Sequence, residues 1–276
     1  MAASEFSRSQ LAEIYKLGSK TVQRIVGNDE WQKRQEARNS AKLKSDFDKI
    51  TDEKHYQRIV WVIFCQHTVS ANVEKRIDTI WKYLGDYKRN MMIKTTGQED
   101  GFIDSMMNDN NMFKSKKKAC AAIDNAFKFD EVVREHAGHG NYAFRAYVLS
   151  FHPWDEYEVD KLVDDMARRF VRFKRISAEH FLTHYGFPLI KPDSNIKRTF
   201  FRIGLIDNED DDKGCVNAGR SMAEAAGVDV YMIDDFVLLG MKKGNEVCGH
   251  EPACQLCDIR PYCRYYKERY RSKPHS

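Results

Sequence analysis

The sequence contains no run of apolar residues long enough to cross a lipid bilayer, for which a helix needs about 20 in succession. Its first six residues, MAASEF, lack the apolar segment of a signal peptide. We therefore expect an intracellular protein, in the cytoplasm and nucleoid or in the nucleus, without a membrane partner. In such compartments thiols stay reduced and disulfides are disfavoured.

Strand patterns are also scarce, because polar and apolar residues almost never alternate, whereas helical spacing is common. With 276 residues, 42% of them hydrophobic, the chain can bury the core of one large or two small domains. No sign of charge dominates, since 45 basic residues nearly balance 41 acidic ones and leave a formal net charge of +4. The basic residues gather at 114–118, 168–175 and 264–273, as a surface that follows phosphates would require. Solvated helix faces explain each of these clusters equally well when it is taken alone.

The densest chemical signal is a C-x5-C-x2-C-x5-C segment formed by Cys248, Cys254, Cys257 and Cys263. Four thiolates suit a tetrahedral zinc ion or a [4Fe-4S] cluster with one thiolate on each iron. Structural zinc sites more often pair two C-x2-C steps across a longer gap. The single short step between two steps of five indicates a bulkier centre, so we favour the [4Fe-4S] cluster over zinc, and either over disulfides. The remaining cysteines, which lie beside apolar helical stretches and are expected to be buried thiols, are Cys65, Cys120 and Cys215.

A polar break interrupts the most apolar helical segment of the chain. Residues 56–64 form a nearly all-apolar helical pattern, and helical spacing resumes at 73–81 after Gln66-His67-Thr68. A polar break between two apolar helices lets a side chain leave the core and reach a partner. A helix N-cap at Thr68 or Ser70, with Gln66 merely exposed, explains the same residues without any partner.

Asp193 follows Pro192 and precedes a helical pattern, as a helix N-cap does. Capping alone would explain this aspartate. Between the polar break and Asp193 lies the basic stretch RRFVRFKRISA, residues 168–178. Two other segments carry only a structural prediction. Residues 89–111, polar and rich in Asn, Asp and Met, are predicted to form a loop or a short irregular helix, and residues 214–239 are predicted to be helical.

In order along residues 56–263, these segments resemble the helix-hairpin-helix DNA glycosylases that carry an iron–sulfur cluster, the endonuclease III and MutY-like proteins. Gln66 and Thr68 match the family's Q-x-T, and residues 113–119 are similar to its Y/F-x-S-K-A segment. Residues 192–205 resemble V-D-T-H-V-x-R-V-x-x-R-L-G-L, with Asp193 at the catalytic aspartate and Arg198 at an arginine. The cysteine spacing is similar to that of the family's cluster, although its first gap has five residues where six are usual.

The hairpin L-x-G-V-G-x-K-T-A is where the sequence departs most from the family. The two glycines, which let backbone N–H groups approach a phosphate, are replaced by Arg172 and Lys174. Ile176 stands at the lysine that forms a Schiff base in bifunctional members, while Ser177 and Ala178 match T-A. The resemblance therefore implies phosphate binding by side-chain charge, and attack on the sugar by water.

The resemblance implies an all-α fold, with a six-helix barrel domain, an iron–sulfur cluster domain and a groove between them. The expected divisions are residues 1–55, packed on the cluster domain, residues 56–188, the barrel with the hairpin, and residues 189–276, the catalytic-aspartate helix with the cluster domain. The expected partner is double-stranded DNA that holds a damaged or mismatched base, bound by a monomer. The expected DNA contacts are Gln66, Thr68, Lys116, Arg172, Lys174, Arg175, Ser177 and Arg198.

The implied activity is that of a monofunctional base-excision-repair N-glycosylase, in which Asp193 stabilises the charged sugar or activates water. MutY-like adenine glycosylases protonate the leaving purine with a glutamate, and Val62 stands at that position. A cationic alkylated purine leaves without such an acid and can stack on aromatic rings, for which Trp61 and Trp154 are the candidates. We therefore favour alkylated purines over mismatched or damaged pyrimidines.

Several alternatives stay open at this point. The chain could be a bifunctional glycosylase/AP lyase that uses Lys174 or Lys191 as a substitute amine, or a mismatch pyrimidine glycosylase. It could equally be a catalytically inactive DNA-binding protein of the same fold, since the hairpin has lost its glycines. The last alternative is an interaction module that is stabilised by a structural zinc ion.

Overall fold

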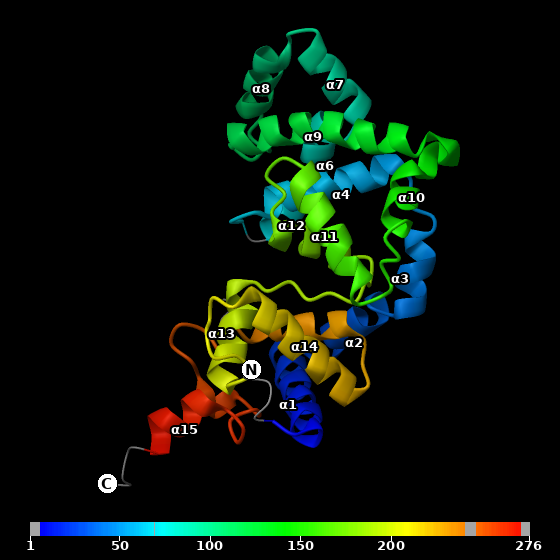
Figure 1. The fold of residues 1–276 in the computed structure, drawn as a ribbon. Coiled ribbons are helices and arrows are strands. Elements are labelled where there is room, and N and C mark those ends of the chain that lie inside the picture. Colours follow the sequence, from blue (N-terminus) through cyan, green and yellow to red (C-terminus); the bar gives the residue numbers. More distant parts are fainter. Residues whose placement is uncertain (1–5, 69, 241–246, 272–276) are drawn as a thin grey trace. The chain divides into compact units, whose positions relative to one another are not determined.

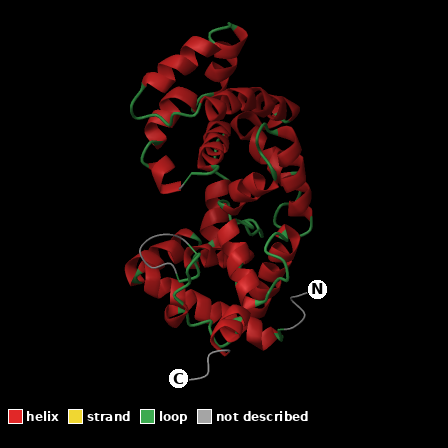
Figure 2. Cartoon of the chain, turned by 90° about the vertical axis from the view of Figure 1, so that its left-hand side faces the viewer, coloured by secondary structure: helices red, strands yellow, loops and turns green. Residues whose placement is uncertain are grey.

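The computed structural model describes residues 6–68, 70–240 and 247–271. Every regular element in these ranges is a helix, and no strand occurs among them (Figures 1 and 2). The all-α fold class is therefore confirmed for this part of the chain. No helix in the same ranges is long and apolar enough to cross a membrane.

The chain divides into two compact units by its internal contacts. The terminal unit comprises Met1–Leu43 and Gly186–Ser276, and the central unit comprises Lys44–Tyr185. The sequence-based divisions fall after residues 55 and 188, whereas the contacts place the boundaries after residues 43 and 185.

The terminal unit combines helices from both ends of the chain. Its elements are α1 (Arg8–Val26), α2 (Asn28–Ala37), α13 (Ser194–Ile203), α14 (Asp212–Ala226) and α15 (Arg264–Arg271), with the 3-10 segments η3 (Val230–Leu239) and η4 (Cys254–Leu256). Helix α3 (Ser40–Phe47) spans the boundary between the units. Helix α1 packs against α14 and η3, and α13 packs against η3, α14 and α15.

Local sequence signals explain how α1 begins and how it packs. The Ser7 hydroxyl accepts a hydrogen bond from the Gln10 N–H, and the Gln10 side chain accepts one from the Ser7 N–H, which forms a capping box. A Cβ atom at Gly18 would lie 2.2 Å from the Phe236 ring. Glycine at this position therefore lets the ring of η3 lie directly on α1, where it joins a core that includes Ile14 and Phe200.

The predicted helical segment at 214–239 is confirmed as α14 and η3, with a break between the two. Gly227 ends α14 with a φ of +67°, a left-handed conformation that glycine adopts without a Cβ clash. Residues 230–239 then form the 3-10 segment η3 rather than a continuation of the α-helix.

The central unit is organised around α4, which packs against α9, α10 and α12. Its elements are α4 (Asp52–Cys65), α5 (Ser70–Glu74), α6 (Ile77–Leu84), α7 (Tyr87–Thr95), α8 (Glu99–Asn108), α9 (Lys116–Glu135), η2 (Ala137–Tyr142), α10 (Ala143–Leu149), α11 (Glu158–Arg169) and α12 (Arg175–Thr183). Residues 59–64 of α4 are all buried, as the nearly all-apolar sequence of this helix predicts.

The region 89–111, predicted as a loop or irregular helix, instead forms most of α7 and α8. Its polar residues obscured the helices because one of them, Asn90, is buried in the core with its amide nitrogen hydrogen-bonded. The Asn90 amide donates hydrogen bonds to the Tyr56 hydroxyl and to the Leu84 carbonyl, each across 2.9 Å. A buried polar group that finds such partners is compatible with a helix packed in the core.

Candidate functional site

Helices α4 and α12 of the central unit pack against each other. The ring of Trp61 on α4 lies 5.0 Å from the ring of His180 and 4.8 Å from that of His184, toward the end of α12. Gln66, which follows the last residue of α4, lies instead beside Ser177 in the first turn of α12. The two helices therefore run antiparallel, and polar side chains gather at each end of the pair.

At one end, Gln66 is bonded to the segment that precedes α12. Its amide nitrogen donates hydrogen bonds to the Arg172 carbonyl, across 2.6 Å, and to the Ser177 hydroxyl, across 3.1 Å. The structure thus brings together two motifs that are far apart in sequence, the Q-x-T residues and the hairpin.

The hairpin itself is a turn between α11 and α12. Arg172 has a φ of +59°, in the left-handed region that favours glycine, and it occupies the place of the first hairpin glycine. Its side chain is exposed, as is that of Lys174, which precedes α12 and makes no side-chain capping bond. Both residues therefore present positive charge to solvent beside the first N–H groups of α12.

Asn125 of α9 holds this turn in place and was not identified from the sequence. Its buried amide accepts a hydrogen bond from the Val171 N–H at 2.7 Å and donates one to the Val171 carbonyl at 2.9 Å. A single asparagine inside an amphipathic helix carries no local signal of such a role, because its partner lies 46 residues away.

Lys118 stabilises the polar break after α4. Its ammonium group donates to the carbonyls of Phe64 and Gln66, at 2.8 and 2.6 Å, and to the Thr68 hydroxyl at 2.9 Å. A cation at the end of a helix satisfies carbonyls that have no partner within the helix. Burial lowers the pKa of Lys118, and the nearby charge of Arg172 acts in the same direction.

Thr68 thus takes part in the local structure of the break, and its hydroxyl also donates to the Gln66 carbonyl at 3.3 Å. Lys116, the other predicted contact from this region, is exposed at the start of α9, with its ammonium 3.6 Å from the Asp100 carboxylate.

Arg175, predicted to contact DNA, lies in an ion-pair network within the protein. Its guanidinium is 2.7 Å from the carboxylates of Asp160 and Asp164 and 3.0 Å from that of Glu179. Two of these carboxylates come from α11, so the arginine joins the two helices of the hairpin. Three carboxylates around one guanidinium leave it poorly placed to bind phosphate.

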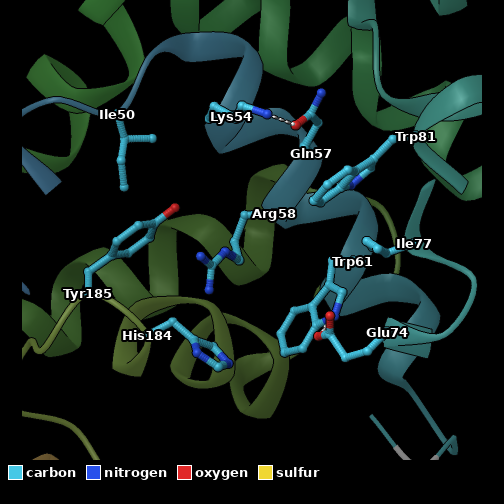
Figure 3. Close-up of a pocket in the computed structure, with 10 residues that line it drawn as sticks. All are labelled: Ile50, Lys54, Gln57, Arg58, Trp61, Glu74, Ile77, Trp81, His184 and Tyr185. Atoms are coloured by element: carbon cyan, nitrogen blue, oxygen red, sulfur yellow. Dashed lines mark hydrogen bonds between the residues drawn. The ribbon is translucent and has the colours of Figure 1, made fainter. Parts of the chain in front are cut away.

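At the other end of the helix pair lies a pocket of about 420 Å³ (Figure 3). Its lining residues are Ile50, Lys54, Gln57, Arg58, Trp61, Glu74, Ile77, Trp81, His184 and Tyr185. Four of them come from one face of α4, at the i, i+3, i+4 and i+7 spacing of a helix. Trp61 is 8% exposed, and its indole N–H donates to the Glu74 carboxylate at 2.7 Å.

The structure separates the two tryptophans that were predicted to share a base pocket. Trp61 lines the pocket, whereas Trp154 does not. Trp154 is half-buried, with the ammonium of Lys44 5.3 Å from its ring centre. The structure therefore places Trp61 but not Trp154 in this pocket, whose second tryptophan is Trp81.

Behind the pocket lies a buried histidine, His55, whose Nδ1 is 2.9 Å from the Tyr185 hydroxyl. Burial lowers the pKa of His55 to about 3, and the charges of Arg58 and Arg145 act in the same direction. The imidazole is therefore neutral at physiological pH and is not repelled by the cations beside it.

In the terminal unit, Asp193 caps α13. Its Oδ1 atom accepts hydrogen bonds from the N–H groups of Asn195 and Ile196, at 2.9 and 3.1 Å. Its Oδ2 atom lies 3.7 Å from the ammonium of Lys191. The capping role considered from the sequence is thereby present in the structure.

Arg198, also predicted to contact DNA, is 8% exposed and faces inward from α13. It donates to the Asn195 side chain at 2.6 Å and to the Cys248 carbonyl at 3.2 Å. Arg202, one turn later, donates to the same carbonyl at 3.1 Å. Arg198 therefore joins the helix capped by Asp193 to the cysteine segment, and its burial withdraws it from a DNA-binding surface.

The four cysteines of the C-x5-C-x2-C-x5-C segment line one pocket in the terminal unit, together with Arg202 and Tyr265. All seven cysteines of the chain are free thiols. Burial raises the pKa of Cys257 to about 12 and that of Cys263 to about 11, and the neighbouring cysteines act in the same direction. In the described ranges, no three His, Cys, Asp or Glu side chains form a group that could hold a single metal ion.

Comparisons were made with protein-family models, with curated proteins and with solved structures. None of them gives a match. What the chain does must therefore be inferred from its own motifs. The central unit brings together Gln66, the hairpin and the pocket around Trp61, and the terminal unit brings together the helix capped by Asp193 and the four cysteines.

Proposed function

We propose that this chain is a monofunctional DNA N-glycosylase, which hydrolyses the bond between a damaged base and its sugar in double-stranded DNA. The observation that carries the proposal is the hydrogen bond from Gln66 to the Arg172 carbonyl. It joins a residue suited to fill the base stack to a turn suited to bind phosphate, although 106 residues separate them. A glycosylase needs both functions on one surface, because the gap left by an extruded base lies beside the phosphates of the DNA backbone that the enzyme binds.

The proposed DNA-binding surface consists of Gln66, Arg172, Lys174 and the first turn of α12. The side chains of Arg172 and Lys174 are exposed, and the first N–H groups of a helix attract anions. Exposed Lys116 is a further candidate for phosphate contact. We leave Arg175 and Arg198 out of this surface, because their guanidinium groups are occupied within the protein.

We also propose that the central unit is the six-helix barrel, and the terminal unit the cluster domain, of the endonuclease III and MutY-like architecture. The position of the motifs supports this division. The hairpin and the Q-x-T residues belong to the central unit, and the catalytic-aspartate helix and the cysteines belong to the terminal unit.

A [4Fe-4S] cluster on Cys248, Cys254, Cys257 and Cys263 is the cofactor that these residues fit best. The four thiols line one pocket, and a [4Fe-4S] cluster takes one thiolate on each iron. The single C-x2-C step between two steps of five favours this cluster over a zinc ion. When bound, the cluster supplies a rigid support for the surrounding loops rather than redox chemistry.

Asp193 is the residue to which we assign the chemistry. As the glycosidic bond breaks, the sugar gains positive charge, which a carboxylate stabilises while it also accepts a proton from the attacking water. Its Oδ2 atom accepts neither of the two capping hydrogen bonds, and its ion-pair partner among the described residues is Lys191. Ile176, at the place of the Schiff-base lysine, has no amine, so the product is an intact strand with an abasic site.

The test is incubation of the purified protein with a panel of duplexes that each hold one damaged or mismatched base. We expect release of a base and strand breakage only after alkali, with no covalent adduct on borohydride treatment. An adduct would show that a lysine acts and would support the glycosylase/lyase alternative. Tight duplex binding without any base release would instead identify a catalytically inactive DNA-binding protein, which the loss of the hairpin glycines makes the second candidate.

A further inference from the structure

The pocket around Trp61 is formed by the same helix pair that carries Gln66, the residue proposed to fill the base stack. Trp61 precedes Gln66 by five residues, which corresponds to about 7.5 Å along the axis of α4. The opposite wall comes from His184 and Tyr185, just after α12, whose first turn bonds Gln66 (Figure 3). A base displaced by Gln66 would therefore find this pocket between the same two chain segments.

The walls of the pocket suit a planar ring. Aromatic side chains line it from three elements, with Trp61 on α4, Trp81 on α6 and Tyr185 after α12 (Figure 3). Two isoleucines, Ile50 and Ile77, add apolar surface. Its volume of about 420 Å³ falls in the range of ligand pockets, roughly 300–1,000 Å³.

Among the charged side chains that line this pocket, Arg58 is the one whose polar atoms are not used by the described part of the protein. Its guanidinium lies over the rings of Trp61 and Tyr185, at 5.8 and 5.5 Å from their centres. Within the described ranges it makes no hydrogen bond and no ion pair. A guanidinium with five N–H donors, held between two rings, is thus directed toward a ligand rather than a protein partner.

The other charged groups of the pocket are engaged. The Glu74 carboxylate accepts the Trp61 indole N–H at 2.7 Å. The Lys54 ammonium donates to Gln57 at 3.0 Å and lies 5.2 Å from the ring centre of Trp81. With two cations and one carboxylate, the lining favours a ligand that carries or develops negative charge.

We propose that Arg58 binds the carbonyl oxygens of the extruded base and stabilises the negative charge that this base gains as the glycosidic bond breaks. The role rests on the glycosylase function proposed above. When the C1′–N bond breaks, its electron pair stays on the base, and water supplies a hydroxyl group to C1′. The remaining proton of that water, accepted first by Asp193, then neutralises the departed base, so atoms and charge balance.

In this role Arg58 takes the place of the general acid that would protonate the leaving base, which the sequence lacks at the expected position. Val62 stands where MutY-like adenine glycosylases carry a glutamate, and it is 1% exposed and cannot donate a proton. Arg58 precedes Val62 by one turn of α4. The substrate class that follows is an uncharged base with carbonyl groups, which departs as an anion. A cationic alkylated purine departs neutral and gains nothing from a guanidinium, so the charge of the pocket opposes the preference inferred from the sequence.

The experiment compares Arg58→Met with wild type in single-turnover base release from duplexes that hold uracil, 5-fluorouracil or 7-methylguanine. Arg145→Met is the matched control, because Arg145 lies in the same unit and near His55 but outside the pocket. We expect Arg58→Met to slow uracil release about 100-fold, the scale for loss of one stabilising donor. The loss should be smaller for 5-fluorouracil, which leaves more readily as an anion, and Arg145→Met should be close to wild type. Arg58→Lys, which keeps the charge without the planar donors, should release uracil at a rate between those of Arg58→Met and wild type.

The outcomes separate this inference from the function on which it rests. If wild type releases only 7-methylguanine, or if Arg58→Met retains full uracil release, the role of Arg58 is wrong and the glycosylase function stands. If both uracils lose the same factor, Arg58 shapes the pocket without stabilising the leaving group, and the inference also fails. If wild type binds the duplexes and releases no base from any of them, the glycosylase function fails and the inference falls with it.

Discussion

The amide nitrogen of Gln66 lies 2.6 Å from the carbonyl oxygen of Arg172 and 3.1 Å from the hydroxyl of Ser177. Both amide N–H donors are therefore engaged before any DNA is bound, and the side chain is held in one orientation. Holding a residue in place in advance lowers the entropic cost of using it in binding. The same bonds fix the turn that carries Arg172 and Lys174. The residue proposed to fill the base stack is therefore held directly to the residues proposed to bind phosphate.

Replacing Gln66 with alanine should weaken binding to a duplex with an abasic site or a lesion about 10-fold, ~1.4 kcal/mol, and binding to an undamaged duplex much less. The reason is that a wedge contributes only once a base has left the stack. Fluorescence anisotropy titrations measure both affinities. Gln98→Ala is the control, because Gln98 is an exposed glutamine of the same unit without a side-chain capping bond. An equal loss on both duplexes would show that Gln66 does not act as a wedge.

Arg172→Gly should be more stable than Arg172→Ala by about 1 kcal/mol, because only glycine adopts a φ of +59° without strain. Both variants should weaken binding to damaged and undamaged duplexes alike. The slope of log affinity against log salt should decrease by about one unit, as for the loss of one phosphate contact. Thermal melts and titrations at several salt concentrations provide the data. An unchanged salt slope would place Arg172 away from the phosphates.

Local sequence patterns predicted the helices and caps of this chain better than the contacts between residues that are far apart in the sequence. The apolar run of α4, the break at Gln66 and the cap at Asp193 depend on neighbouring residues, and each is visible in the sequence. The common pocket of the four cysteines also follows from spacing alone, because they lie within 16 consecutive residues.

The role of a charged or polar side chain depended instead on tertiary neighbours. Arg175 and Arg198 both looked like phosphate contacts, yet carboxylates of α11 surround the first and the Cys248 carbonyl binds the second. Asn125 pairs with Val171 across 46 residues, and no local pattern indicates it. Arg58 was overlooked because it stands in an apolar helix, and only the packing of Trp61 and Tyr185 around it reveals a pocket.

Protein purified without oxygen should be brown, with about four iron and four sulfide per chain, as one [4Fe-4S] cluster requires. Cys257→Ser should lose the visible absorbance and unfold at a lower temperature, because the cluster replaces a core that residues 247–263 lack. Cys120→Ser, at a half-buried thiol of the central unit, is the control and should keep the colour. Stoichiometric zinc without iron would contradict the assignment.

The stability of the terminal unit should depend on the protonation of Asp234. Burial raises the pKa of Asp234 to about 6, and repulsion from Asp193 and Asp235 adds to this, against the attraction of Arg38 and Lys191. The folded protein therefore binds this proton more tightly than the unfolded chain does. The resulting stabilisation is complete below about pH 4, the pKa of an unfolded aspartate, and is lost as the pH rises through 6.

Asp234→Asn should accordingly gain stability relative to wild type as the pH is raised from 4 to 7. Thermal melts across this range, with Asp207→Asn as an exposed control in the same unit, measure the difference. A difference in melting temperature that stays constant with pH would show that Asp234 titrates as an ordinary surface carboxylate.

Asp193→Asn should abolish base release while it leaves the fold and duplex binding intact. Asparagine caps a helix about as well as aspartate, so the bonds to the Asn195 and Ile196 N–H groups are kept. Only the negative charge is removed. Asp211→Asn is the matched control, since Asp211 caps α14 of the same unit by a bond to the Gly214 N–H.

Single-turnover base release from a lesion duplex that wild type cleaves, measured for Asp193→Asn beside Asp211→Asn, tests the catalytic role of Asp193 most directly. We expect release by Asp193→Asn to fall at least about 100-fold, with a duplex affinity close to that of wild type, and release by Asp211→Asn to be nearly unchanged. Unimpaired release by Asp193→Asn would contradict the proposed mechanism and leave Asp193 as a helix cap alone.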